Sequence, residues 1–275
     1  MSQKGLWLLV LIAALGTGGY IYWREGTQQP PAPPPAPAVA EKPAAEPPAP
    51  AGPEHPMESE KVTLPALDES DATLVVALSG VIGQKPVADF FHITGMVRRF
   101  VGTVDNLPRE KVAQKLMPVK PTAGRFAVSG EGDNAVLSPE NYRRYAPAMK
   151  VLEAADARKL VAVYAHFYPL FQQAYAELGY PNAYFNDRLV QVIDHLLAAP
   201  EARAPVRLVR PKVMYQYADP ELESLSAGHK IMVRIGPENS ARVKSKLREL
   251  RAELTTRAMA APAKNAESKP QNPKP

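Results

Sequence analysis

An uncharged run of 19 residues near the amino terminus constrains this chain more than any other feature. It extends from Gly5 to Trp23 and is bounded by Lys4 and Arg24. As a helix rising ~1.5 Å per residue it would be ~28 Å long, close to the ~30 Å hydrocarbon core of a bilayer. Both tryptophans of the chain lie at its two ends, where aromatic side chains gather at membrane interfaces. The run therefore predicts a transmembrane anchor over residues 1–27.

A cleaved signal peptide is the alternative interpretation of this run. Such a peptide has an apolar region of about 7–15 residues and ends in a small-x-small cleavage site. Here the run ends in the bulky residues Tyr20 to Trp23, which favour an uncleaved anchor that contacts the lipid bilayer through Gly5–Trp23. The flanking charges favour a cytoplasmic amino terminus. We therefore expect a single-pass protein of the inner (cytoplasmic) membrane with a periplasmic domain.

Residues 28–61 form a low-complexity segment of Pro, Ala and Glu. Twelve of the 30 prolines lie between Pro30 and Pro56. The segment has too few apolar residues to offset the entropy of ordering, so we predict a disordered spacer. Proline favours extended backbone, which gives the 29 residues Gln28–Pro56 a reach of up to ~90 Å at ~3.1 Å per residue. Alternatively, it is a ligand for a proline-recognising module in the cytoplasm.

From residue 62 to residue 258 the composition is that of a globular domain, and residues 259–275 are predicted to be a disordered tail. Apolar spacing and capping residues predict a mainly α fold with at most a small β element. Helix starts are predicted at Ser138-Pro139-Glu140 and Asp219-Pro220-Glu221, each a capping residue followed by proline at the first helical position. Longer helices are predicted over Asp68–Leu78, Pro86–Val104, Asp156–Leu178 with a kink at Pro169, Tyr184–Leu197 and Pro237–Arg257. Strands are predicted at Arg125–Val128 and Ala135–Leu137, which could pair across a Gly-rich loop, and at Val206–Val209.

Several classes of chemistry have no support in the sequence. The chain has no cysteine, which excludes disulfides, thiolate zinc sites and a cysteine nucleophile. It has no phosphate-binding P-loop, no G-x-G-x-x-G and no His-Glu-x-x-His motif. We therefore predict no cofactor and no metal, and we assign no catalytic residue.

One polar helix face nevertheless permits an enzymatic interpretation. Asp187, Gln191, Asp194 and His195 share this face of the helix predicted over Tyr184–Leu197. The carboxylates could act as an acid/base pair, and His195 could carry a proton. The simpler interpretation, which we favour, is the solvated face of an amphipathic helix.

Aromatic residues are concentrated between Tyr164 and Phe185. At helical spacing such residues usually form core, with tyrosine hydroxyls reaching the surface. They could instead line a groove that stacks on sugar rings or on an extended peptide. We favour the core interpretation, although a kink at Pro169 would open space between helices.

The last predicted helix carries a surplus of basic residues that could bind a partner. Anionic lipid, an acidic protein or a polyanion of the envelope would suit such a surface. The alternative is an exposed face with internal ion pairs, such as Glu238–Arg242 and Glu253–Arg257. The candidate surface comprises Arg242, Lys244, Lys246, Arg248 and Arg251.

Five long stretches between Leu64 and Leu254 carry a family resemblance. They are Arg98-Arg99-Phe100 through Arg109, Tyr168-Pro169-Leu170-Phe171 through Pro181, Tyr184 through Arg188, Ala218-Asp219-Pro220 through Asn239, and Val243-Lys244 through Arg251. In these stretches the chain resembles a bacterial family known as domain of unknown function 3014. The resemblance implies an amino-terminal anchor, a Pro-rich spacer and this domain, and it implies no activity, ligand or catalytic residue.

The sequence thus predicts a membrane-anchored, non-enzymatic binding or scaffold module of the cell envelope. Its partners would be the bilayer and an unknown envelope protein or polyanion. Nucleic acid is not expected, because the domain would lie outside the cytoplasm. Two alternatives stay open. One is an envelope enzyme that uses Asp187, Asp194 and His195, and the other is a cytoplasmic-facing adaptor with an inverted anchor.

Overall fold

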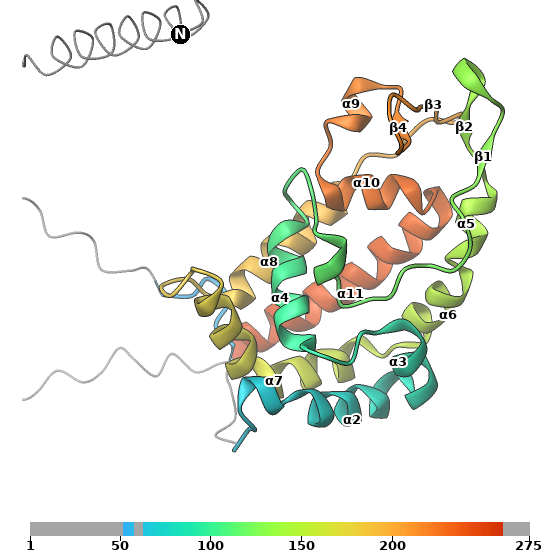
Figure 1. Cartoon of the computed structure of the whole chain (residues 1–275). Helices are drawn as coiled ribbons and strands as arrows, with labels where there is room; N and C mark the ends of the chain where they lie inside the picture. The colour runs from blue at the N-terminus through green and yellow to red at the C-terminus, as the bar shows by residue number, and fades with distance from the viewer. Residues whose placement is uncertain (1–51, 58–62, 261–275) are drawn as a thin grey trace, which may run out of the picture. The chain divides into compact units, whose positions relative to one another are not determined.

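The structure is a computed structural model that describes residues 52–57 and 63–260. The predicted anchor, most of the spacer and residues 261–275 lie outside the described residues. Within the described part of the chain, no helix is both long and apolar enough to cross a membrane. This part contains ten α-helices and two small antiparallel sheets, which confirms the prediction of a mainly helical domain (Figure 1).

The helices account for most of the described residues, and two long connections, residues 107–139 and 198–219, carry the short strands. The α-helices are α2 (Asp71–Ile82), α3 (Gln84–Phe90), α4 (Met96–Asn106), α5 (Glu140–Arg144), α6 (Ala146–Ala154), α7 (Ala157–Glu177), α8 (Phe185–Leu197), α9 (Pro220–Glu223), α10 (Ala227–Arg234) and α11 (Pro237–Ala260). Three 3-10 turns are η1 (Leu67–Glu69), η2 (Gln114–Leu116) and η3 (Gly132–Asn134).

The main core lies around α7, which packs against α2, α4, α8 and α11. Phe167 of α7 and Phe185 of α8 are its largest fully buried side chains. Phe171 stacks on Phe185, with ring centroids 6.0 Å apart, and Phe100 of α4 meets both rings edge-on. Most of the aromatic cluster is therefore core, as the helical spacing predicts. α7 continues through Pro169 as one helix.

Local capping signals locate several helix starts correctly. The Asp156 carboxylate accepts the Lys159 N–H at 2.9 Å and begins α7. The Asp219 carboxylate does the same for the Glu221 N–H and begins α9. α6 and α10 were not predicted, although Ser226 caps α10 in the same way.

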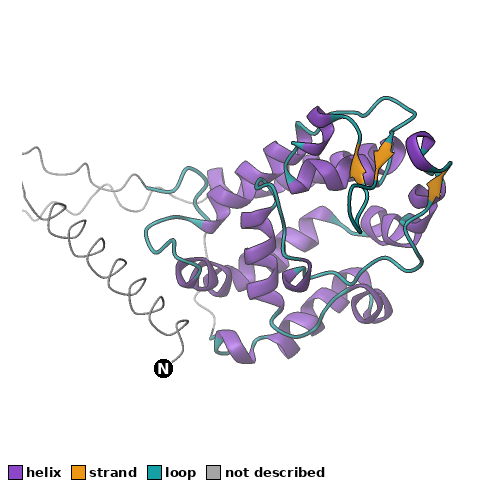
Figure 2. Cartoon of the chain, turned by 45° about the horizontal axis from the view of Figure 1, so that its top comes forward, coloured by secondary structure: helices purple, strands orange, loops and turns teal. Residues whose placement is uncertain are grey.

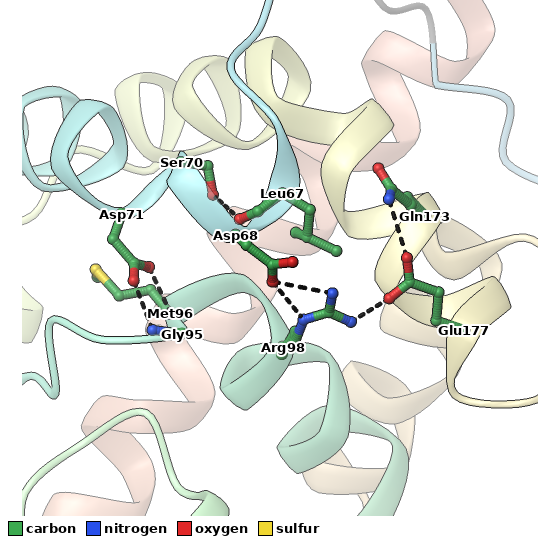
Figure 3. A network of polar contacts seen from close by, with 9 residues as sticks. All are labelled: Leu67, Asp68, Ser70, Asp71, Gly95, Met96, Arg98, Gln173 and Glu177. Atoms are coloured by element: carbon green, nitrogen blue, oxygen red, sulfur yellow. Dashed lines mark hydrogen bonds and ion pairs between the residues drawn. The ribbon is translucent and has the colours of Figure 1, made fainter.

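The prediction of one helix over Pro86–Val104 was wrong, because the chain forms α3 and α4 with a break between them. Gly95 has a φ of 64°, a left-handed conformation that interrupts a helix. The Asp71 carboxylate accepts the N–H groups of Gly95 at 2.6 Å and Met96 at 2.9 Å, and so caps the start of α4 (Figure 3). This cap comes from a residue that is distant in sequence, and apolar periodicity alone cannot show it.

An ion-pair network fixes α4 between the first helices and α7. Arg98 of α4 contacts the Asp68 carboxylate at 3.1 Å and also pairs with Glu177 at the end of α7. Gln173 donates to the other oxygen of Glu177 at 2.9 Å (Figure 3). Three helical segments, η1, α4 and α7, are thereby linked on one side of the core.

The short strands gather at one end of the helical domain (Figure 2). β1 (Val128–Ser129) pairs with β2 (Val136–Leu137), and β3 (Leu208–Val209) pairs with β4 (Gln216–Tyr217), both antiparallel. A single bridge between Val136 and Arg207 joins the two pairs. The predicted pairing of the strands on either side of the Gly-rich loop is confirmed. These strands cover a separate small core beside α10.

Candidate functional site

A cleft of about 660 Å³ opens where the carboxyl ends of α4 and α7 meet α8. Its walls combine tyrosine rings with charged and amide side chains. The residues that matter for its chemistry are Asp105, Tyr175, Tyr180, Tyr184, Arg188 and Gln191. Residues 52–55 close one side of it.

The buried carboxylate of Asp105 organises the interior of the cleft. Only 4% of this side chain is exposed, and it pairs with Arg109 at 2.6 Å and Arg188 at 3.2 Å. Arg188 also donates to the Asp105 carbonyl at 2.9 Å, and the Tyr180 hydroxyl donates to the carboxylate at 3.4 Å. The Asp105 charge raises the pKa of the Arg109 guanidinium. Asp105 therefore fixes the positions of the cations and of Tyr180 beside the cleft.

Gln172 of α7 fixes the turn that carries the aromatic wall. Its Nε2 donates to the Ala183 carbonyl at 2.7 Å, while its Oε1 accepts the Phe185 N–H at 2.8 Å. The Tyr168 hydroxyl donates to the same Oε1 at 3.1 Å, and burial raises the pKa of Tyr168 to about 12. Because the Tyr168 hydroxyl stays protonated at physiological pH, this donor is permanent.

The tyrosines of the predicted aromatic cluster divide into two groups. Tyr164 is buried in the core, whereas Tyr175, Tyr180 and Tyr184 line the cleft. The rings of Tyr175 and Tyr180 stack with their centroids 4.7 Å apart. The cluster therefore forms core and also lines a cleft, with Tyr175 contributing to both, while ligand stacking on these rings stays a prediction.

Residues 52–57, which the sequence places in the spacer, bind to the amino-terminal end of α8. The Asp187 carboxylate accepts the Glu54 N–H at 3.0 Å and the His55 N–H at 2.7 Å. Asn186, which is fully buried, donates from Nδ2 to the His55 carbonyl at 2.8 Å. Met57 packs against the main core. Two adjacent side chains of α8 thus recognise the backbone of an extended segment.

The polar helix face considered as a catalytic site is divided between three environments. Asp187 binds the backbone of residues 54 and 55. Asp194 also lines the cleft and forms a two-bond ion pair with Arg251, at 2.5 and 3.0 Å. His195 Nε2 instead lies 2.8 Å from the Ser226 hydroxyl, outside the residues that line the cleft.

His195 forms a stacked pair with His229 at the junction of α8 and α10. Their ring centroids are 4.0 Å apart, and His229 Nε2 donates to the His195 carbonyl at 2.7 Å. Burial, the neighbouring His229 and Arg188 lower the pKa of His195. This environment therefore favours the neutral form of the His195 imidazole where the two helices meet.

The candidate basic surface on α11 is largely engaged in contacts within the domain. Lys246 is 7% exposed and donates to the Ala155 carbonyl at 2.8 Å. Lys244 donates to the Ala199 carbonyl at 2.7 Å, and Arg251 pairs with Asp194. Arg242 also has a partner inside the domain, Glu153, at 3.4 Å. Arg248 is exposed. Whether this surface binds a partner stays a prediction.

The sequence did not indicate Asp105, which lines the cleft, or Gln172, which holds the turn beside it. Asp105 stands beside the buried Val104 near the end of an apolar helix face, and that placement is a weak signal of a buried charge. Gln172 stands within the aromatic pattern of α7 with no distinguishing neighbour. No side-chain cluster of the described residues has the composition of a metal site.

The family of this chain follows from comparison with known proteins. The family model described as "Protein of unknown function (DUF3014)" matches residues 96–251, and the chain belongs to that family. The match begins at α4 and ends within α11, so it is shorter than the resemblance from Leu64 to Leu254. No curated protein and no solved structure shows significant similarity to the chain.

Proposed function

We propose that this protein is a non-enzymatic binding module of the cell envelope, anchored in the inner membrane through Gly5–Trp23. Its cleft binds an extended peptide segment of an envelope partner. One observation carries this proposal: Asp187 and Asn186 already hold the backbone of Glu54 and His55 through three hydrogen bonds.

The chemistry of these contacts suits peptide recognition. A carboxylate that accepts two successive N–H groups and an amide that donates to the next carbonyl read the backbone without reading side chains. The adjacent cleft offers Tyr175, Tyr180 and Tyr184 as surfaces for apolar or proline side chains. Aromatic grooves of this kind favour extended, proline-containing peptides, which lose little entropy on binding.

The same contacts favour a binding role over the enzymatic alternative. Asp187 holds backbone donors, Asp194 is paired with Arg251, and His195 contacts Ser226. The three groups therefore stabilise the domain at three different places. The basic groups beside the cleft, Arg109 and Arg188, share the single negative charge of Asp105.

The proposal is tested with a labelled peptide that copies residues 51–57. The full chain with Glu54→Pro and His55→Pro keeps Asp187 and Asn186 but lacks both backbone donors of its own segment. We expect this double variant to bind the peptide, as measured by fluorescence anisotropy. The wild-type chain should bind it at least tenfold more weakly, because its own segment competes at high effective concentration.

Two matched controls make the result specific. A peptide with proline at both donor positions should not bind, and adding Asp187→Ala to the double variant should weaken binding at least tenfold. Circular dichroism verifies that each variant is folded. Absence of binding by a folded double variant, or equal binding of both peptides, would contradict the proposal.

A further inference from the structure

The β3–β4 hairpin exposes a group of apolar side chains at the end of the domain away from the cleft. Val213 is 76% exposed and Met214 is 71% exposed, although both are large apolar residues. Tyr215 lies beside Phe126 of the preceding loop, with ring centroids 5.9 Å apart. Exposed apolar residues that stand together, unlike isolated ones, indicate an interaction surface.

The hairpin and the residues directly before it are strongly basic. Residues 203–217 contain four cationic side chains and no acidic one. All four are exposed, and none forms an ion pair with another described residue. The four are Arg203, Arg207, Arg210 and Lys212. This arrangement contrasts with α11, where most of the candidate cations have partners inside the domain.

In the loop that joins β3 and β4, the cation Arg210 contacts the apolar residues Val213 and Tyr215. Arg210 Nε donates to the Val213 carbonyl at 3.1 Å, and its guanidinium lies 5.5 Å from the centre of the Tyr215 ring. These contacts place a cation directly beside the exposed apolar residues. The surface therefore presents both kinds of group on one short loop.

A lipid surface matches this combination better than an acidic protein or a dissolved polyanion does. A polyanion would neutralise the cations but leave Val213 and Met214 in water. At the surface of an anionic bilayer, apolar side chains enter the interface while Arg and Lys bind headgroup phosphates. Tyrosine is also enriched at that depth.

We propose that the β3–β4 hairpin docks the domain onto an anionic lipid bilayer. Val213 and Met214 enter the interface, and Arg210 and Lys212 contact the phosphates. This inference does not depend on peptide binding in the cleft. A chain anchored in the same membrane would keep the hairpin at high effective concentration near the lipid, so weak docking would suffice.

The absence of cysteine makes a site-specific test possible. A full chain with Met214→Cys, labelled with an environment-sensitive fluorophore, is reconstituted with vesicles of phosphatidylcholine or of phosphatidylcholine with phosphatidylglycerol at three to one. We expect a blue shift and an intensity increase with the anionic vesicles only. The same label at Val76→Cys, on the exposed side of α2, should show no difference.

Charge and position provide two further checks. Arg210→Gln with Lys212→Gln should reduce the response about 25-fold in apparent affinity, since each basic residue near the surface contributes roughly fivefold. If Met214→Cys disturbs folding, the measurement is repeated with the label at Val213→Cys. An equal response to both vesicle types, no response to either, or a response to added polyphosphate but not to lipid would overturn the proposal.

Discussion

Replacing Asp105 by alanine should destabilise the domain by about 3 kcal/mol, and this prediction examines the central contact of the cleft. The Asp105 side chain is 4% exposed and pairs with Arg109 and Arg188. Removing one partner of a buried ion pair costs about 3–5 kcal/mol, because the remaining charge stays buried without compensation. Arg188 is 22% exposed and Arg109 can turn into water, which places the cost at the lower end.

Asp68→Ala provides a matched control. Asp68 also pairs with an arginine, Arg98, at a similar distance of 3.1 Å, but its side chain is 82% exposed. Exposed pairs contribute less than about 1 kcal/mol. The two variants therefore differ mainly in burial, and their difference isolates the effect of burial on the ion pair.

Urea unfolding of the full chain in one detergent, followed by circular dichroism, measures both variants. A third variant, Asp105→Ala with Arg188→Ala, removes both charges and should recover part of the loss. The reasoning would be refuted if Asp105→Ala and Asp68→Ala lowered the free energy of unfolding equally. It would also be refuted if the double replacement at 105 and 188 recovered none of the stability that Asp105→Ala loses.

Three further predictions concern other parts of the chain. Gly236→Ala should lower the free energy of unfolding by about 1–3 kcal/mol, because φ is 88° and the added Cβ would lie 2.5 Å from Tyr142. Gly80→Ala is the control and should not destabilise the domain, because nothing lies within 4 Å of the added Cβ. Burial lowers the pKa of His195 below its ordinary 6.5, so the unfolded chain binds a proton more readily than the folded domain does. The free energy of unfolding should therefore decrease as the pH is lowered from about 6.5. His195→Gln should remove part of this decrease, as measured by urea midpoints at a series of pH values. The chain should stay in the membrane fraction after alkaline extraction, with an intact amino terminus before Gly5–Trp23, and a mature terminus near residue 20–30 would contradict the anchor.

Local signals were enough to predict the main helices and one strand pair. Asp156 and Asp219 act on backbone N–H groups two or three residues away, so their capping role is visible in the sequence. The apolar spacing of α7 and α8 likewise depends only on helical period. Such features require no knowledge of what packs against them.

The features that the sequence could not show depend on residues far apart in the chain. Gly95 begins α4 instead of lying inside a longer helix because Asp71, 24 residues earlier, binds its N–H. The cleft depends on Asp105 meeting Arg188, 83 residues later. Periodicity assigns a side chain to a face but does not identify the group that meets it there.

Residues 52–57 show how part of the predicted spacer can bind to a helix of the domain. Proline makes the segment a poor core former, and for that reason the sequence predicts disorder. Proline also restricts the unfolded chain, so Pro53 and Pro56 reduce the entropy that the segment loses when it binds. With that cost reduced, three hydrogen bonds to α8 and the packing of Met57 are enough to hold six residues in place. The proline content that prevents this segment from folding alone thus makes it a suitable ligand for a preformed helical surface. For the same reason we expect the cleft to select extended, proline-containing peptides.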